Sequence, residues 1–168
     1  MNARLILFSL IAGIALIFTS CDTDNNEGVI PLPSVTQAFQ EKYPNARDVF
    51  FNVDGIYFVV DFKNNNVSTT AWFTDQGVWV MDKAYLPFQQ LPTEVITAFK
   101  ASNYSQWPVD DSYVINHIDS AVIYKIEVES GDNEVDLYYS ASGELLKVVE
   151  DDPNGDSPDS IPQEVTDL

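Results

Sequence analysis

One pattern in this chain occurs twice, and it constrains the fold more than any other feature. The stretch Tyr57–Trp79 reads YFVVDFKNNNVSTTAWFTDQGVW, and the stretch Tyr124–Leu145 reads YKIEVESGDNEVDLYYSASGEL. Each contains two strand-like runs joined by a turn and then a second turn with a glycine. Internal repetition at such a period indicates one supersecondary unit that is used twice.

A helical pattern precedes each copy. The spacing Val-x-x-Ala-Phe places apolar side chains on one helical face at residues 35–39 and again at 95–99. Runs rich in β-branched and aromatic residues follow, bounded by Gly and Asn turns, and they predict antiparallel strands. The predicted strands are 47–53, 57–62, 67–73 and 78–81, then 113–118, 122–129, 134–139 and 145–149. Each unit is therefore expected to be a helix followed by four strands, in residues 31–86 and 87–150.

The charge of the chain limits its partners. The 168 residues carry 26 Asp and Glu against eight Lys and Arg, for a formal net charge of −18. Such a surface repels phosphate backbones, so nucleic acid is not expected as a partner. A length of this size suits one domain or two very small ones, and the 45% of apolar residues suffices for a core.

The N-terminus has the pattern of a signal peptide. Arg4 is followed by an apolar run, 5–18, which is shorter than the ~20 residues that a membrane-spanning helix needs. The run ends in Phe-Thr-Ser-Cys, which resembles a bacterial lipobox and implies cleavage after residue 20 and lipidation of Cys21. The alternative is a plain secretory signal with an incidental cysteine. Residues 21–30 are polar and acidic and are expected to be a lipidated tether.

Lipidation predicts a clear phenotype. We expect Cys21→Ala to release the protein from the membrane fraction or to leave the precursor uncleaved, because the thiol that receives the lipid is gone. Fractionation followed by immunoblotting measures both effects. A variant that fractionates and is processed like the wild type would contradict the lipobox interpretation.

Comparison of the two copies predicts which side chains face away from the helices. Trp72 matches Tyr138 in the third strand of each copy, and Phe58 and Val60 match charged residues of the second copy. We therefore expect Phe58, Val60, Trp72 and Tyr138 to lie on the outer face of the sheet. Aromatic residues on an open sheet face are enriched at recognition surfaces, so these four are the predicted binding residues.

Catalytic and metal chemistry have little support. The only histidine is His117, in a strand pattern without a nucleophile motif nearby, and Cys21 is the only cysteine, which excludes a Cys/His zinc site and an intramolecular disulfide. The spacing Asp152-x-Asn154-x-Asp156 supplies the first ligands of a calcium loop, but Ser157 stands where glycine is required. We interpret residues 151–168 as an acidic disordered tail and predict no catalytic residue, no metal and no cofactor.

Several short motifs together resemble one known family. They are L-P-x-x-V-x-x-A-F at 91–99, Tyr-x-x-Trp at 104–107, Tyr-x-Val-x-Asp-Phe at 57–62 and Phe-x-x-x-Gly-x-Trp at 73–79. Their order resembles the PepSY-like, β-lactamase-inhibitor-protein-like periplasmic proteins of Bacteroidota, over residues 31–150. The resemblance implies an α+β fold in which two αββββ repeats form one curved antiparallel sheet with the helices on one face. It implies no settled activity, and a likeness of fold does not carry over inhibition of β-lactamase.

The predicted function follows from these parts. We expect a non-enzymatic lipoprotein of the cell envelope, held in the outer membrane by its lipid and facing the periplasm or the cell surface. It would bind another macromolecule, a protein, through the exposed sheet face. The alternative is an envelope module that binds a small molecule or a glycan, which would use the same aromatic residues.

Overall fold

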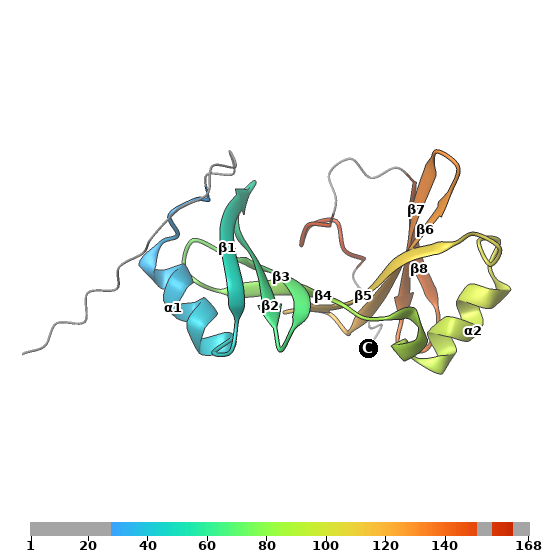
Figure 1. The fold of residues 1–168 in the computed structure, drawn as a ribbon, viewed down its shortest axis with the longest axis horizontal. Helices are drawn as coiled ribbons and strands as arrows, with labels where there is room; N and C mark the ends of the chain where they lie inside the picture. Colours follow the sequence, from blue (N-terminus) through green and yellow to red (C-terminus); the bar gives the residue numbers. More distant parts are fainter. Residues whose placement is uncertain (1–27, 151–155, 163–168) are drawn as a thin grey trace, which may run out of the picture.

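The computed structural model describes residues 28–150 and 156–162, and it contains one antiparallel sheet of eight strands (Figure 1). Every strand pairs with its neighbour in the sequence, so the order in the sheet is the order in the chain. The elements are α1 (Pro33–Lys42), β1 (Arg47–Asp54), β2 (Tyr57–Asn64), β3 (Val67–Phe73), β4 (Trp79–Tyr85), η1 (Phe88–Gln90), α2 (Thr93–Ala101), β5 (Val109–His117), β6 (Ile123–Ser130), β7 (Asn133–Ser140) and β8 (Leu145–Glu150). The expected curved antiparallel sheet with two helices is confirmed.

Strands β4 and β5 join the two halves of the sheet, and both are longer than their sequence pattern predicts. Met81–Tyr85 of β4 pairs with Tyr113–His117 of β5 in an unbroken antiparallel register. The helices lie near the two ends of the molecule, and this central pair of strands runs between them (Figure 1). Among the described residues, no helix is long and apolar enough to cross a membrane.

Each helix covers its own half of the sheet on the same face. Val35 and Phe39 of α1 are buried against β2 and β3, and Val95 and Phe99 of α2 are buried against β6 and β7. Pro33 occupies the first turn of α1, where its missing N–H costs nothing. The buried residues of the first cluster are Val35, Phe39, Tyr43, Val60, Phe62, Ala71 and Phe73, and those of the second are Leu91, Val95, Phe99, Ile126, Val128, Val135, Leu137 and Tyr139.

Two glycines bring a turn of the sheet against the first residues of each helix. Gly77 has a φ of +80°, and a Cβ there would lie 2.6 Å from the carbonyl oxygen of Ser34. Gly143 has a φ of +85°, and its Cβ would lie 2.6 Å from the carbonyl oxygen of Glu94. Both the backbone conformation and the lack of space therefore require glycine.

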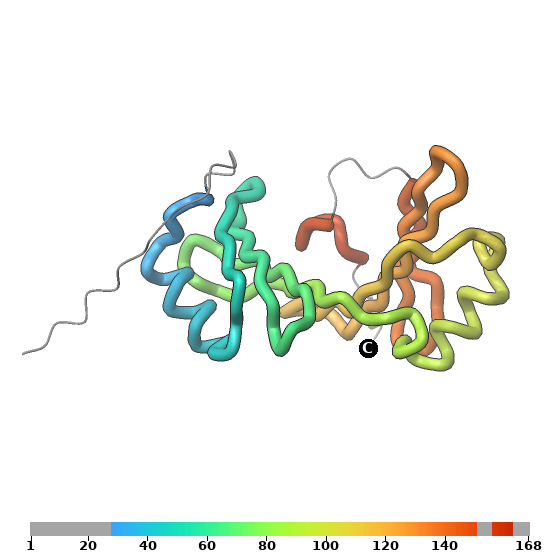
Figure 2. The backbone as a smooth tube through the Cα atoms, in the orientation of Figure 1, coloured from blue at the N-terminus to red at the C-terminus, as the bar shows by residue number. Residues whose placement is uncertain are grey.

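The opposite face of the sheet has an apolar cluster of its own, which crosses both halves. Its buried members alternate along the strands with those of the helix face, as the pleat requires. They are Val59, Trp72, Met81, Ile115, Ile123 and Tyr138, with Ile161 of the C-terminal segment. Residues 156–162, drawn in red, run between the two ends of the molecule in Figure 2. The prediction of a disordered tail is therefore wrong for residues 156–162; residues 151–155 and 163–168 lie outside the described residues.

The predicted face of Phe58 and Val60 is also wrong. Val60 is fully buried in the α1 cluster, and Phe58 packs against that cluster. Strand β2 is apolar on both faces, so its sequence lacks the alternation that would set its register. The comparison of the two copies matched Phe58 with the charged residue Lys125, which is one position out of step. In the structure Phe58 pairs with Phe73 as Tyr124 pairs with Tyr139.

Candidate functional site

Three lysines from three strands lie on the sheet face opposite the helices. Lys125 of β6 is paired with Tyr138 of β7, and Tyr138 is paired with Lys147 of β8, so these side chains form one row across the sheet. Lys83 of β4 is paired with Ile115, a member of the cluster on that face. In a chain of net charge −18, this is a local concentration of positive charge.

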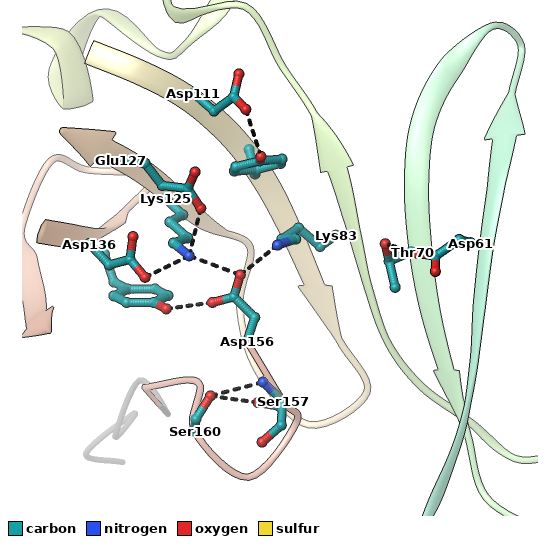
Figure 3. A network of polar contacts seen from close by, with 12 residues as sticks. Asp61, Thr70, Lys83, Asp111, Lys125, Glu127, Asp136, Asp156, Ser157 and Ser160 are labelled. Carbon is teal, nitrogen blue, oxygen red and sulfur yellow. Dashed lines mark hydrogen bonds and ion pairs between the residues drawn. The ribbon is translucent and has the colours of Figure 1, made fainter. Parts of the chain in front are cut away.

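Asp156 of the C-terminal segment is bound in the middle of these residues (Figure 3). Its Oδ2 lies 2.7 Å from Lys83 Nζ and 3.0 Å from Lys125 Nζ. The hydroxyl of Tyr138 donates a hydrogen bond to Oδ1. Lys83, Lys125 and Tyr138 are hereafter called the lysine cradle. The Asp156 side chain is only 1% exposed, so the cradle encloses a carboxylate.

Lys125 is shared among three carboxylates. Besides Asp156, it lies 2.8 Å from Glu127 Oε1 and 2.7 Å from Asp136 Oδ2. Its own side chain is 3% exposed, so the ammonium group depends on these partners in place of water. The cluster therefore contains three carboxylates around two lysines.

The excess of carboxylates over lysines shifts the pKa values of the cluster. Burial alone would raise the pKa of Asp156, but Lys83 and Lys125 outweigh it and hold that pKa below its usual range. Burial would lower the pKa of Lys125, but its carboxylate partners outweigh it and raise that pKa. Burial raises the pKa of Asp136 to about 6 despite the contact with Lys125. The Oδ1 of Asp136 is buried and has no hydrogen-bond partner among the described residues, so it is the natural site for a proton.

The rest of the segment makes side-chain contacts with the same face. Lys147 Nζ donates to the carbonyl oxygen of Ser160 at 2.7 Å, and the hydroxyl of Tyr57 donates to Asp159 Oδ1 at 3.1 Å. Ser157 and Ser160 close a small turn through a backbone bond of 3.0 Å. The hydroxyl of Ser160 also accepts a bond of 3.0 Å from the Ser157 backbone N–H and donates one of 2.9 Å to the Ser157 carbonyl oxygen (Figure 3). Ile161, 4% exposed, completes the apolar cluster. The segment is thus attached at Asp156 by charge and at Ile161 by apolar burial.

The predicted binding residues are divided between the two faces. Trp72 and Tyr138 lie on the face opposite the helices, as expected, but they are 4% and 1% exposed, and Phe58 and Val60 lie on the helix face. The prediction required these four side chains to be exposed together on one face, and the structure does not show this. Sequence reasoning considered Asp156 only as a candidate calcium ligand, and it did not identify Lys83 or Lys125 as site residues. The available signal was the apolar pair Ile-Pro at 161–162 inside an otherwise acidic tail.

The structure shows the contacts of the residues that were considered for metal binding and for catalysis. The carboxylate of Asp156 contacts two lysines, which removes one of the three calcium ligands that the Asp152-x-Asn154-x-Asp156 spacing supplies. His117 Nδ1 accepts a bond of 3.2 Å from the backbone N–H of Asp119, an ordinary structural contact. Asp110, Asp111 and Glu127 bring carboxylate oxygens close together, but exposed acidic groups often do so without a metal ion.

A groove lies on the helix side, between α1 and the edge strand β1. It has a volume of about 630 Å³, and its lining is mostly apolar. The lining residues are Thr36, Phe39, Gln40, Tyr43, Pro44, Ala46, Val49 and Phe51. This groove has no contact with the lysine cradle.

Comparison with known proteins identifies the family. A family model described as "Putative beta-lactamase-inhibitor-like, PepSY-like" matches residues 56–147, more than half of the chain. The chain belongs to this family. The resemblance inferred from the short motifs is thereby confirmed. No match was found among curated proteins.

Solved structures of Bacteroides proteins share the fold of this PepSY-like chain. A "BLIP-like protein" of Bacteroides fragilis is 30% identical, with a TM-score of 0.68 over 76% of this chain and 92% of that chain. A "DUF2874 family protein" of Bacteroides ovatus is 28% identical, with a TM-score of 0.69 over 73% of this chain and 89% of that chain. One described as "putative periplasmic proteins", from Bacteroides eggerthii, is 26% identical, with a TM-score of 0.70 over 73% of this chain and 90% of that chain. None of these descriptions names an enzymatic activity.

Proposed function

We propose that this chain is a non-enzymatic envelope protein that binds another protein through the sheet face opposite the helices. The observation that carries the proposal is the second apolar cluster on that face, which Ile161 of the C-terminal segment joins and beside which Lys125 is buried. A domain whose helices already bury one sheet face has no need of charged groups buried on the other. Membership of a family described as inhibitor-like supports a binding role in general.

The composition of this face suits an interface. Trp72 and Tyr138 supply large aromatic surfaces, and Lys83 and Lys125 supply charge within the same area. Binding energy at interfaces is concentrated in aromatic and cationic residues of this kind near the centre of the buried patch. The cluster includes residues of both halves of the sheet, so a partner would contact both.

Crosslinking in cells tests which face is used. A photoreactive phenylalanine derivative placed at Asp61 or Tyr85, exposed positions on the face opposite the helices, should form a discrete adduct with a partner. The matched control is the same residue at Lys100, which is exposed on α2. Adducts are detected by immunoblotting and mass spectrometry. An adduct from Lys100 with none from Asp61 and Tyr85 would place the interface on the helix side and refute the proposal.

The groove beside α1 supports a second candidate function, the binding of a small apolar molecule. Its aromatic lining and its volume of about 630 Å³ are of the size that small ligands use. Such a ligand would raise the thermal stability of the chain without changing the crosslinks at Asp61 or Tyr85. A glycan would require aromatic platforms open to solvent, which Trp72 does not offer.

The proposal includes the anchor and the internal repeat. Lipidation at Cys21 would hold the domain in the outer membrane, with residues 21–30 as tether, facing the periplasm or the cell surface. We also infer that residues 31–86 and 87–150 are two copies of one αββββ unit. The equivalent contacts that Gly77 and Gly143 make with their helices support this inference.

A further inference from the structure

We propose that residues 156–162 occupy, within the same molecule, a binding site for an acidic peptide segment of the partner protein. The partner segment would supply a carboxylate to the lysine cradle in place of Asp156 and an apolar side chain in place of Ile161. The C-terminal segment would then act as an internal competitor that must leave before the partner binds. This inference rests on the proposed function, because it concerns the same face.

The first argument is the chemistry of the cradle. Lys83, Lys125 and Tyr138 converge on one carboxylate from three different strands, with Asp156 Oδ2 at 2.7 and 3.0 Å from the two ammonium groups. Burying such charges is costly and is not needed for stability, since apolar residues of similar volume do as well or better. A cradle of this kind is therefore better explained by selection of a carboxylate ligand than by the folding of the sheet.

The second argument is the way in which the segment is held. Within the described residues, it adds no strand to the sheet, and its own backbone bond is a local turn between Ser157 and Ser160. Its attachments to the sheet are side-chain contacts of Asp156 and Asp159, the bond from Lys147 to the Ser160 carbonyl, and the burial of Ile161. A segment held by a few side chains can be exchanged for another of like chemistry without unfolding the sheet.

The third argument is that polar groups of this face are left unsatisfied by the segment. The indole Nε1 of Trp72 is buried, belongs to the same cluster as Ile161, and has no hydrogen-bond partner among the described residues. Asp136 Oδ1, beside Lys125, is also buried and has no hydrogen-bond partner among the described residues. Buried polar atoms without partners are uncommon, and a ligand bound on this face would be placed to supply partners to these two.

These contacts define the partner chemistry. The ligand is a protein segment with an aspartate or glutamate and, five positions further on, an aliphatic side chain. A second copy of this chain could also donate its own residues 156–162, which is an outcome that the experiment below separates.

The experiment uses the mature chain from residue 21 with Cys21→Ser, so that no lipid or thiol interferes. The probe is a fluorescent synthetic peptide of residues 151–168, DDPNGDSPDSIPQEVTDL. We expect little binding to the wild type, whose cradle is occupied, and binding about tenfold tighter or more to the variants Asp156→Asn and Ile161→Ala, because charge-assisted contacts and apolar burial each contribute at that scale. Asp159→Asn is the matched control, since Asp159 is exposed, does not touch the cradle, and is replaced by a side chain that keeps the Oδ1 acceptor for the Tyr57 hydroxyl. It should behave like the wild type.

Two further measurements complete the test. In the first, the probe peptide itself carries Asp156→Asn, and it should no longer bind the Ile161→Ala chain, whose cradle is intact. The Ile161→Ala chain remains informative if the full-length Asp156→Asn variant does not fold. Equal binding of the probe to wild type and both variants, or undiminished binding of the altered peptide, would overturn the proposal. In the second, light scattering measures whether the wild type is a dimer that the substitution Asp156→Asn dissociates. That result would mean that each copy donates its segment to the other, and it would overturn occupation of the cradle within one molecule. Peptide binding without crosslinks at Asp61 or Tyr85 would refute the proposed function alone, and crosslinks without peptide binding would refute this inference alone.

Discussion

Replacing Phe39 by alanine is expected to lower the free energy of unfolding by about 3–5 kcal/mol. The Phe39 side chain is 4% exposed and lies at the centre of the first helix-side cluster. Its ring meets those of Phe62 at 5.0 Å, Tyr43 at 5.5 Å and Phe51 at 5.6 Å between centroids. Truncation removes these contacts and leaves a cavity that a rigid sheet cannot fill. Urea unfolding followed by circular dichroism measures the loss.

The matched control for this substitution is Ile56→Ala. Ile56 is 76% exposed at the first hairpin, so its removal should change stability by no more than about 0.5 kcal/mol. Phe99→Ala in the second cluster should give a loss similar to that of Phe39→Ala, since Phe99 is also 4% exposed. If Phe39→Ala were no more damaging than Ile56→Ala, the core assignment of α1 would be incorrect.

Lys125→Met is the second substitution with a large expected effect. Removing one member of a buried charge cluster typically costs about 3–5 kcal/mol, because the partners remain buried without compensation. Here Asp156 would keep its contact with Lys83, whereas Glu127 and Asp136 would lose the ion pair that each makes with Lys125. Methionine keeps the apolar stem of lysine, so the loss reports on charge more than on packing. The same unfolding measurement at pH 8 gives its size.

The loss in Lys125→Met should also depend on pH. Asp136 has a pKa raised to about 6, so the stability that its protonated form contributes is present at low pH and is lost as the pH rises through about 6. Protonation of Asp136 relieves the unpaired negative charge, and the destabilisation should be smaller at pH 5 than at pH 8. Lys100→Met, at an exposed position of α2, is the control and should be near neutral at both values. A Lys125→Met protein as stable as the wild type at pH 8 would mean that the cluster is solvated and not buried.

The sequence allowed much of the fold to be predicted, because its turns are chemically explicit. Gly55, Asn65 and Asn66 adopt positive φ in the first two hairpins, and Gly131 does so in a later one. Such residues end strands at fixed positions, so the strand assignments agreed with the structure to within a few residues, apart from the longer β4 and β5. The helices were equally clear from the shared Val-x-x-Ala-Phe spacing.

The binding face was harder to predict for two physical reasons. Strand β2 has buried apolar residues on both faces, such as Val59 and Val60, so its hydrophobic pattern does not determine which side chains face the helices. One signal was present: with Phe58 aligned to Tyr124, Asp61 matches Glu127, and both carboxylates then lie on the same face. The second reason is that Asp156 and Ile161 depend on partners that are distant in the sequence, and a charged Pro/Gly/Ser segment has no local pattern that reveals such contacts.

Amide hydrogen exchange of residues 156–162 tests the central claim most directly, namely that Asp156 holds this segment on the sheet face opposite the helices. In the wild type we expect the segment to exchange slower than an unstructured chain by roughly an order of magnitude or more. The backbone N–H of Ser157 donates to Ser160 Oγ, and that of Ser160 donates to the Ser157 carbonyl oxygen, each at 3.0 Å in the docked turn. Asp156→Asn should abolish that protection, and Asp159→Asn should leave most of it. Exchange at the rate of an unstructured chain in the wild type, or equal protection in both variants, would contradict the account.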